Sequence, residues 1–93
     1  MLMEKRIGAA IILVKDRAAI NYLNKIVSEH AEIVIGRQGI PLQQKEINVI
    51  TLVLEGSTDE IGSLTGKLGR LEGVQIKSAL IKNDAVEADN SGN

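Results

Sequence analysis

Two stretches of the sequence are apolar at nearly every position. They are residues 5–14 and residues 47–54, and the second reads INVITLVL. Neighbouring residues of a strand point to opposite faces of a sheet, so a strand that is apolar at both parities is covered on both faces. These stretches therefore predict two strands in the middle of a sheet.

Two other stretches have the periodicity of amphipathic helices. In residues 16–30 apolar positions recur at spacings of three and four, and Asp16 is placed to cap the helix start. The second helix is expected to begin near Thr58, because Ser57 and Glu60 form the pattern of a capping box. Its apolar stripe consists of Ile61, Leu64, Leu68 and Leu71. Each helix therefore has one face that can pack on a sheet.

Residues 31–37 and 74–81 predict the two remaining strands, the second of them after a break at Gly73. Residues 38–46, with Gly39 and Pro41, predict a hairpin-type connection that is longer than a tight turn. Strand–helix–strand thus occurs twice, which predicts an α+β, ferredoxin-like βαββαβ sandwich. In this topology the first and third strands lie in the middle of a four-stranded antiparallel sheet, and both helices cover one face.

The helix-free face of such a sheet would expose the isoleucine, valine, leucine and alanine side chains of the central strands. Monomeric proteins seldom leave an apolar patch of this kind open. We therefore expect a homo-oligomer, either a dimer or a tetramer. At least one of its interfaces should use the helix-free face or an exposed strand edge.

The length of 93 residues is that of one domain with a single two-layer core. We expect this domain to span residues 5–82, after a flexible start at residues 1–4. Residues 83–93 contain three acidic side chains and no cation, which predicts a disordered acidic tail. No apolar run approaches the roughly 20 residues of a membrane span, and no signal-peptide pattern is present, so the cytoplasm is the expected location.

Composition argues against several functions that this topology serves. The formal net charge is -1, and it becomes +2 without residues 83–93, so direct DNA binding is not expected. Tyr22 is the single aromatic residue, whereas RNA-recognition domains stack bases on aromatic side chains of the central strands. Cysteine is absent, so thiolate-bound iron–sulfur clusters are excluded. The acidic residues are scattered, so we predict no catalytic residues and no enzyme activity.

Two segments are candidates for ligand binding. Asp16 and Arg17 follow the first strand directly, and Arg17 with the amides of a helix start could bind a carboxylate or phosphate. The alternative is a helix cap beside a solvated charge. Arg37, Gln38 and Gly39 are the second candidate, together with the Ile-Pro that follows, because Arg37 could hold an oxyanion. The alternative there is an ordinary hairpin.

Gly62, Gly66 and Gly69 stack on one side of the second helix. Each glycine inside a helix costs roughly 0.5–1 kcal/mol relative to alanine, so three of them imply a reason. We expect close packing against the first helix or a neighbouring subunit, with backbone access for a ligand as the alternative. The spacing does not match a phosphate-binding Walker loop. The single histidine, His30, would need donors from elsewhere to bind a metal, so we predict no metal site within one chain.

Particular stretches resemble known families. Residues 12–23 (ILVKDRAAINYL) and 68–79 (LGRLEGVQIKSA) resemble regulatory ACT-like domains. A closer resemblance is to the iron-only hydrogenase system regulators, which are similar in fold to the metal-sensing domain of the nickel-responsive repressor. The segments that carry it are EKRIG (4–8), GRQGIP (36–41), STDE (57–60), LTGKLGRL (64–71) and GVQIKSA (73–79). The chain lacks the histidines and cysteine of the nickel repressor's site, so nickel sensing does not carry over. It has no DNA-recognition helix either, so DNA binding does not carry over.

The resemblance implies an oligomeric, ACT-like regulatory or sensor module of an iron-only hydrogenase system. Such a module acts by binding a small ligand or a protein rather than by catalysis, and the sequence leaves its cofactor unknown. The alternative is a small metal-binding protein or enzyme whose site is assembled between subunits. In that case His30 would meet carboxylates of another chain.

Overall fold

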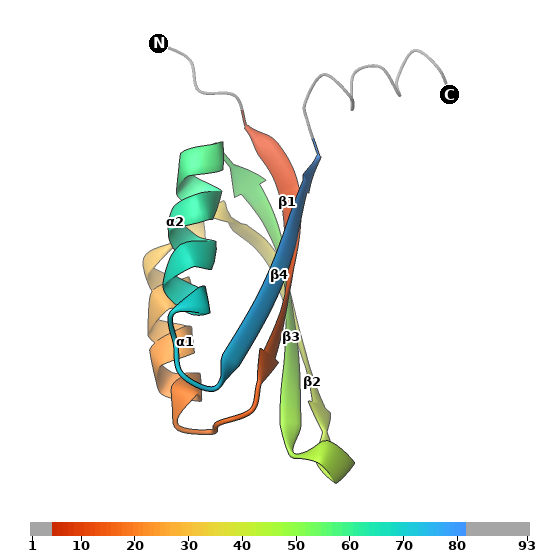
Figure 1. Cartoon of the computed structure of the whole chain (residues 1–93). Helices are drawn as coiled ribbons and strands as arrows, with labels where there is room; N and C mark the ends of the chain where they lie inside the picture. The colour runs from red at the N-terminus through yellow and green to blue at the C-terminus, as the bar shows by residue number, and fades with distance from the viewer. Residues whose placement is uncertain (1–4, 82–93) are drawn as a thin grey trace, which may run out of the picture.

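The computed structural model describes residues 5–81 as one four-stranded sheet with two helices on one of its faces (Figure 1). The strands lie in the order β2-β3-β1-β4, and all neighbours are antiparallel. The main elements are β1 (Arg6–Val14), α1 (Ala19–Glu29), β2 (Val34–Leu42), β3 (Ile47–Gly56), α2 (Thr58–Gly69) and β4 (Val74–Ile81). The predicted ferredoxin-like fold is confirmed, with the first and third strands in the middle of the sheet.

The core lies between the sheet and the two helices. Ile12 of β1, Leu52 of β3, Leu23 of α1 and Leu64 of α2 are fully buried there. The remaining buried apolar residues are Ala10, Val14, Ala19, Val27, Ile33, Ile50, Leu54, Ile61 and Leu68. Every second residue of the central strands points into this layer, which is why the strands are apolar at one parity. Their other parity faces away from the helices.

Helix α2 begins where the sequence predicts. The Oγ atom of Ser57 accepts a hydrogen bond from the Glu60 amide at 3.1 Å, and the Ser57 amide donates to Oε1 of Glu60 at 2.9 Å. This capping box satisfies two amides that the helix itself cannot bond.

The second strand differs most from the prediction. Residues 31–33 form a 3₁₀ turn, η1 (Ala31–Ile33), and β2 runs on to Leu42 instead of ending at residue 37. The long partner β3 explains the extension, because it pairs with β2 up to Leu42 and Ile47. Pro41 fits within β2 because an edge strand has one side without a partner.

The connection between β2 and β3 is consequently shorter than expected. It consists of the 3₁₀ turn η2 (Gln43–Lys45) and Glu46, whose φ of 55° is left-handed. None of the helices in residues 5–81 is long and apolar enough to cross a membrane. The predicted flexible start and acidic tail lie outside the described residues.

Candidate ligand site

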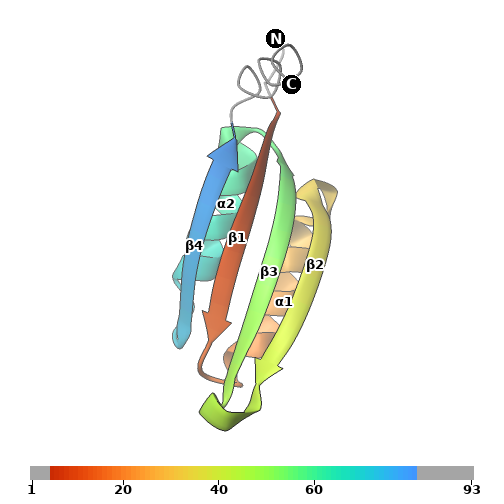
Figure 2. The same cartoon turned by 90° about the vertical axis from the view of Figure 1, so that its right-hand side faces the viewer.

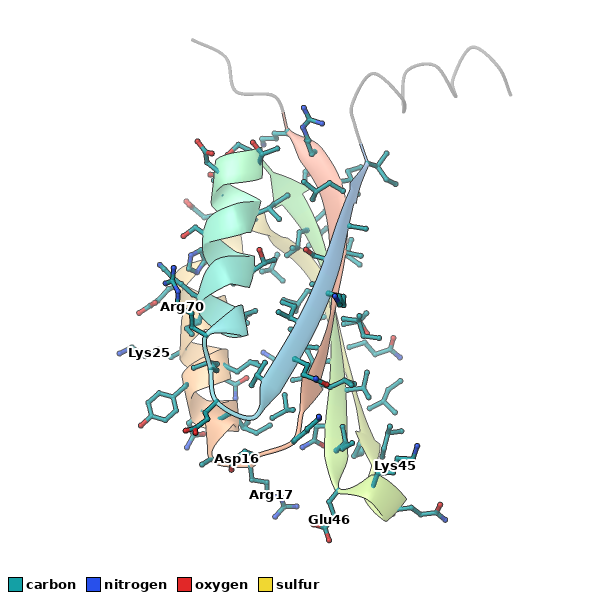
Figure 3. The ribbon with its side chains drawn as sticks, in the orientation of Figure 1. Asp16, Arg17, Lys25, Lys45, Glu46 and Arg70 are labelled. Atoms are coloured by element: carbon teal, nitrogen blue, oxygen red, sulfur yellow. The ribbon has the colours of Figure 1, made fainter. Side chains whose placement is uncertain are left out.

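A hollow of about 670 Å³ lies at one end of the molecule, where the loop after β1 meets the end of the β2–β3 hairpin. Figure 3 shows Asp16 and Arg17 on the loop and Glu46 on the hairpin at this end. The hollow is lined by Lys15, Asp16, Arg17, Pro41, Leu42, Gln43, Glu46, Ile47 and Asn48. Two cationic side chains, two carboxylates and two side-chain amides thus surround a space open to solvent.

Antiparallel pairing brings these segments together. Val14, the last residue of β1, lies opposite Asn48 at the beginning of β3. The loop that leaves Val14 must therefore pass beside the turn that enters β3. Gln43, Glu46 and Asn48 were not predicted as lining residues from the sequence. The signal that could have found them is the antiparallel pairing of the two central strands, which places the end of one beside the beginning of the other.

The amides at the start of α1 are already hydrogen-bonded. The Ala18 amide donates to Oδ1 of Asp16 at 2.9 Å. The N-cap of α1 is Ala18 and not Asp16, so the prediction of Asp16 as the cap is wrong, and its carboxylate bonds the turn that precedes the helix. The Ala19 and Ile20 amides donate to the carbonyls of Asp16 and Arg17 at 2.9 and 3.1 Å. The expectation that these amides are free for an anion is therefore wrong. A ligand in the hollow would be bound by side chains, with Arg17 exposed beside it.

The loop that carries Asp16 and Arg17 is held by the turn before β4. The Lys15 amide donates to the Gly73 carbonyl at 2.7 Å. Gly73 has a φ of +78°, and a Cβ atom there would lie 2.5 Å from the Cβ of Asp16. This close approach requires glycine and fixes the backbone at one side of the hollow.

The second sequence candidate does not form a site of its own. Arg37, Gln38 and Gly39 lie within β2 and not in a loop, so their side-chain positions alternate between the two faces. On the helix side, Nη2 of Arg37 donates to Oδ1 of Asn24 on α1 at 2.7 Å. Gln38 lies opposite Thr51 and belongs to the other face. None of the three lines the hollow, although the neighbouring Pro41 does.

Comparison with known proteins identifies the family. Residues 6–78 match the model of the TM1266-like family, described as "Iron-only hydrogenase system regulator, putative". The chain belongs to this family. A solved structure of the uncharacterized protein TM1266 from Thermotoga maritima is similar at 34% sequence identity and a TM-score of 0.81, covering 85% of this chain and 100% of that one. The resemblance found in the sequence is thereby confirmed.

A more distant structure shows the same fold alone. The C-terminal domain of the MgtC protein from Mycobacterium tuberculosis has 12% identity and a TM-score of 0.65, covering 84% of this chain and 89% of that one. A search of curated proteins found no match.

In this TM1266-like chain, His30 lies at a second hollow, of about 290 Å³, between the end of α1 and the start of α2. Its Nδ1 atom is 2.8 Å from the Ile26 carbonyl oxygen, which can only accept, so Nδ1 donates. The other ring nitrogen, Nε2, lies 3.5 Å from Oγ of Ser63. The carboxylate residues at this hollow are Glu29, Glu32, Asp59 and Glu60. Within residues 5–81 no three histidine or acidic side chains are placed to hold a metal ion.

The glycines of α2 do not serve packing between the two helices of this chain. A Cβ atom at Gly62 or Gly66 would meet nothing within 4 Å, and one at Gly69 would lie 3.5 Å from Cγ2 of Ile76 on β4. The contact with Ile76 places this side of α2 above the edge strand β4 and away from α1. The expectation that these glycines pack against the first helix is therefore wrong. Packing against a neighbouring subunit remains a prediction.

Proposed function

We propose that the chain is a homo-oligomeric, cytoplasmic regulatory module of an iron-only hydrogenase system that acts by binding a small ligand or a protein, without catalysis. Membership in the TM1266-like family supports the regulatory role. The observation that carries the ligand is the hollow beside Lys15 and Arg17. Its volume falls within the roughly 300–1,000 Å³ of small-molecule pockets.

A small carboxylate such as an amino acid fits the charges of this hollow. Lys15 and Arg17 can attract the carboxylate, while Glu46 can accept from an ammonium group. Asp16 opposes an anion less than its charge suggests, because Oδ1 already accepts the Ala18 amide. The interaction would therefore depend on side chains of the loop and the hairpin together.

Ligand-induced thermal stabilisation tests this proposal. A ligand at a hundredfold excess over Kd stabilises the folded state by about 2.7 kcal/mol. For a domain of this size the melting temperature should then rise by roughly 10 °C or more. The screen should contain amino acids, nucleotides and divalent metals. Arg17→Ala should abolish the shift for a carboxylate hit.

The matched control is Lys25→Ala, because Lys25 is another exposed cation of the first helix segment and does not line the hollow (Figure 3). It should leave the shift unchanged. A screen in which no compound stabilises the wild type argues against a small ligand and favours protein binding. A hit that survives Arg17→Ala undiminished would place the ligand elsewhere.

The second candidate function is a metal-binding protein or enzyme with its site assembled between subunits. It is favoured by His30, which lines a hollow beside carboxylate residues. Zinc or nickel would require further donors from another chain. The metals in the same screen test this candidate, and His30→Ala should abolish any shift that they produce.

A further inference from the structure

The sheet face that the helices leave uncovered is apolar at its centre. We call this surface the open face, and Figure 2 shows it in front of the helices. On the central strands, Ala9 lies opposite Val53 and Leu13 opposite Val49. Ile11 and Val53 are 48% and 45% exposed, although side chains of this type are usually buried in a core. Apart from Thr51, which lies opposite Ile11, the centre of the open face therefore has the composition of an interior.

The margins of the open face are partly polar and partly apolar, with the exposed Ile40 on β2 and Ile81 on β4. Gln38 belongs to the edge strand β2, and Gln75 and Lys77 belong to the other edge strand β4. Glu55 lies near the end of β3, opposite Ile7. An apolar centre with polar side chains at its rim is the arrangement of protein–protein interfaces, and Gln38, Gln75, Lys77 and Glu55 provide such side chains here.

The size of the open face suits a stable dimer. Four strands at a spacing of about 4.8 Å and a length of about 30 Å cover roughly 570 Å² before the relief of the side chains is counted. Standard interfaces bury about 800 Å² per partner, with a range of roughly 600–1,000 Å². The flat area lies just below this range and the relief of the side chains adds to it, so an interface of standard size has to cover the whole open face.

We propose that the open face binds the open face of a second copy of this chain, sheet against sheet. This proposal specifies the homo-oligomer of the proposed function. A two-fold axis places the same patch on both sides, so apolar centre meets apolar centre and rim meets rim. Packed sheets lie about 10 Å apart with interdigitating side chains, and exposed isoleucine and valine can fill that space.

The charges select the direction of the two-fold axis. Lys77, Ile11, Thr51 and Gln38 form one row across the sheet, from β4 to β2. An axis across the strands along this row would place Lys77 opposite Lys77 of the second copy. An axis parallel to the strands places Lys77 opposite Gln38, which can accept its hydrogen bonds. The second arrangement avoids the repulsion of like charges, so the axis follows the strands.

Light scattering after size exclusion tests the interface with the full chain. The wild type should have at least twice the 10.0 kDa mass of one chain at micromolar concentration. Ile11→Lys should halve the measured mass of a dimer, because it buries an unpaired charge at the centre. The control is Tyr22→Lys, since Tyr22 is 64% exposed on α1 and lies away from the open face. It should leave the mass unchanged.

A wild-type mass of 10.0 kDa, or a folded Ile11→Lys variant with the wild-type mass, would overturn the proposal. Circular dichroism shows whether that variant folds. If it does not, Ile11→Cys and Tyr22→Cys provide a second test, because the chain has no other cysteine. The thiol at position 11 should be protected from a maleimide and that at position 22 should react; equal reactivity would reject the interface. Arg17→Ala should keep the wild-type mass, so loss of the ligand site and loss of the dimer are separate results.

Discussion

Glycine has opposite consequences at two positions that are seven residues apart. Gly66 lies inside α2 with open space where a Cβ atom would stand. Gly73 lies in the turn after α2. Its backbone is left-handed, and a Cβ atom at this position would clash with the Cβ of Asp16. At Gly66 no contact within the chain requires glycine. At Gly73 the fold requires a residue without a side chain.

We predict that Gly66→Ala raises the free energy of unfolding by about 0.5–1 kcal/mol, because alanine loses less backbone entropy in a helix. Gly73→Ala should lower it by at least about 1–2 kcal/mol, since an L-residue is strained at this φ. Urea unfolding followed by circular dichroism measures both changes. A loss of stability at Gly66 would show that α2 makes a contact outside its own chain. An unchanged free energy of unfolding in Gly73→Ala would contradict the left-handed turn at this position.

At the scale of single elements, α2 depends on Ser57, the residue that caps its start. Ser57 is buried, and its hydroxyl and the Glu60 carboxylate each accept an amide hydrogen bond.

Ser57→Ala should lower the free energy of unfolding by about 1 kcal/mol, because one buried amide loses its partner. Ser28→Ala, at an exposed position of α1, is the control and should change it by less than about 0.5 kcal/mol. Chemical denaturation with equal m-values for the three proteins gives the comparison. Equal midpoints for the two variants would mean that the capping box contributes nothing to stability.

The bounds of an element could be predicted where residues close to its ends in the sequence mark them. The start of helix α2 and the bounds of strand β4 were predicted to within a residue, because a capping box and a glycine mark them locally, whereas α2 ends at Gly69, before the last residue of its predicted apolar stripe. The bounds of strand β2 were not predicted, because its extension to Leu42 depends on pairing with β3, and this pairing is not marked by residues near its ends. The proposed ligand hollow shows the same division. Asp16 and Arg17 were found in sequence, but Glu46 and Asn48 reach them only through the sheet.

At the scale of the whole molecule, the net charge is close to zero. Eleven cations are balanced by twelve acidic side chains over the chain. Both helices of the described residues pack on the sheet, so neither is available as a recognition helix.

We therefore predict that the purified protein does not bind duplex DNA specifically by itself. Gel-shift assays with labelled duplexes of the hydrogenase gene region, at physiological salt, provide the measurement. Weak binding that disappears with added salt is the non-specific electrostatic effect and is compatible with the prediction. A shift that depends on the DNA sequence and persists at this salt is not.

The sheet order also determines which contacts are made across the longest stretches of chain. Val14 pairs with Val74 and Ile7 with Ile81, so the partners in β1 and β4 are 60 to 74 positions apart. The beginning of β1 and the end of β4 consequently lie side by side (Figure 1). A linker between these neighbouring ends, with new ends opened in the exposed turn Gln43–Lys45, would turn the most distant strand pair into a local hairpin. The same change would separate β2 from β3 by the whole length of the chain, so the permutant would form the same sheet with its most local and its most distant strand pairs exchanged.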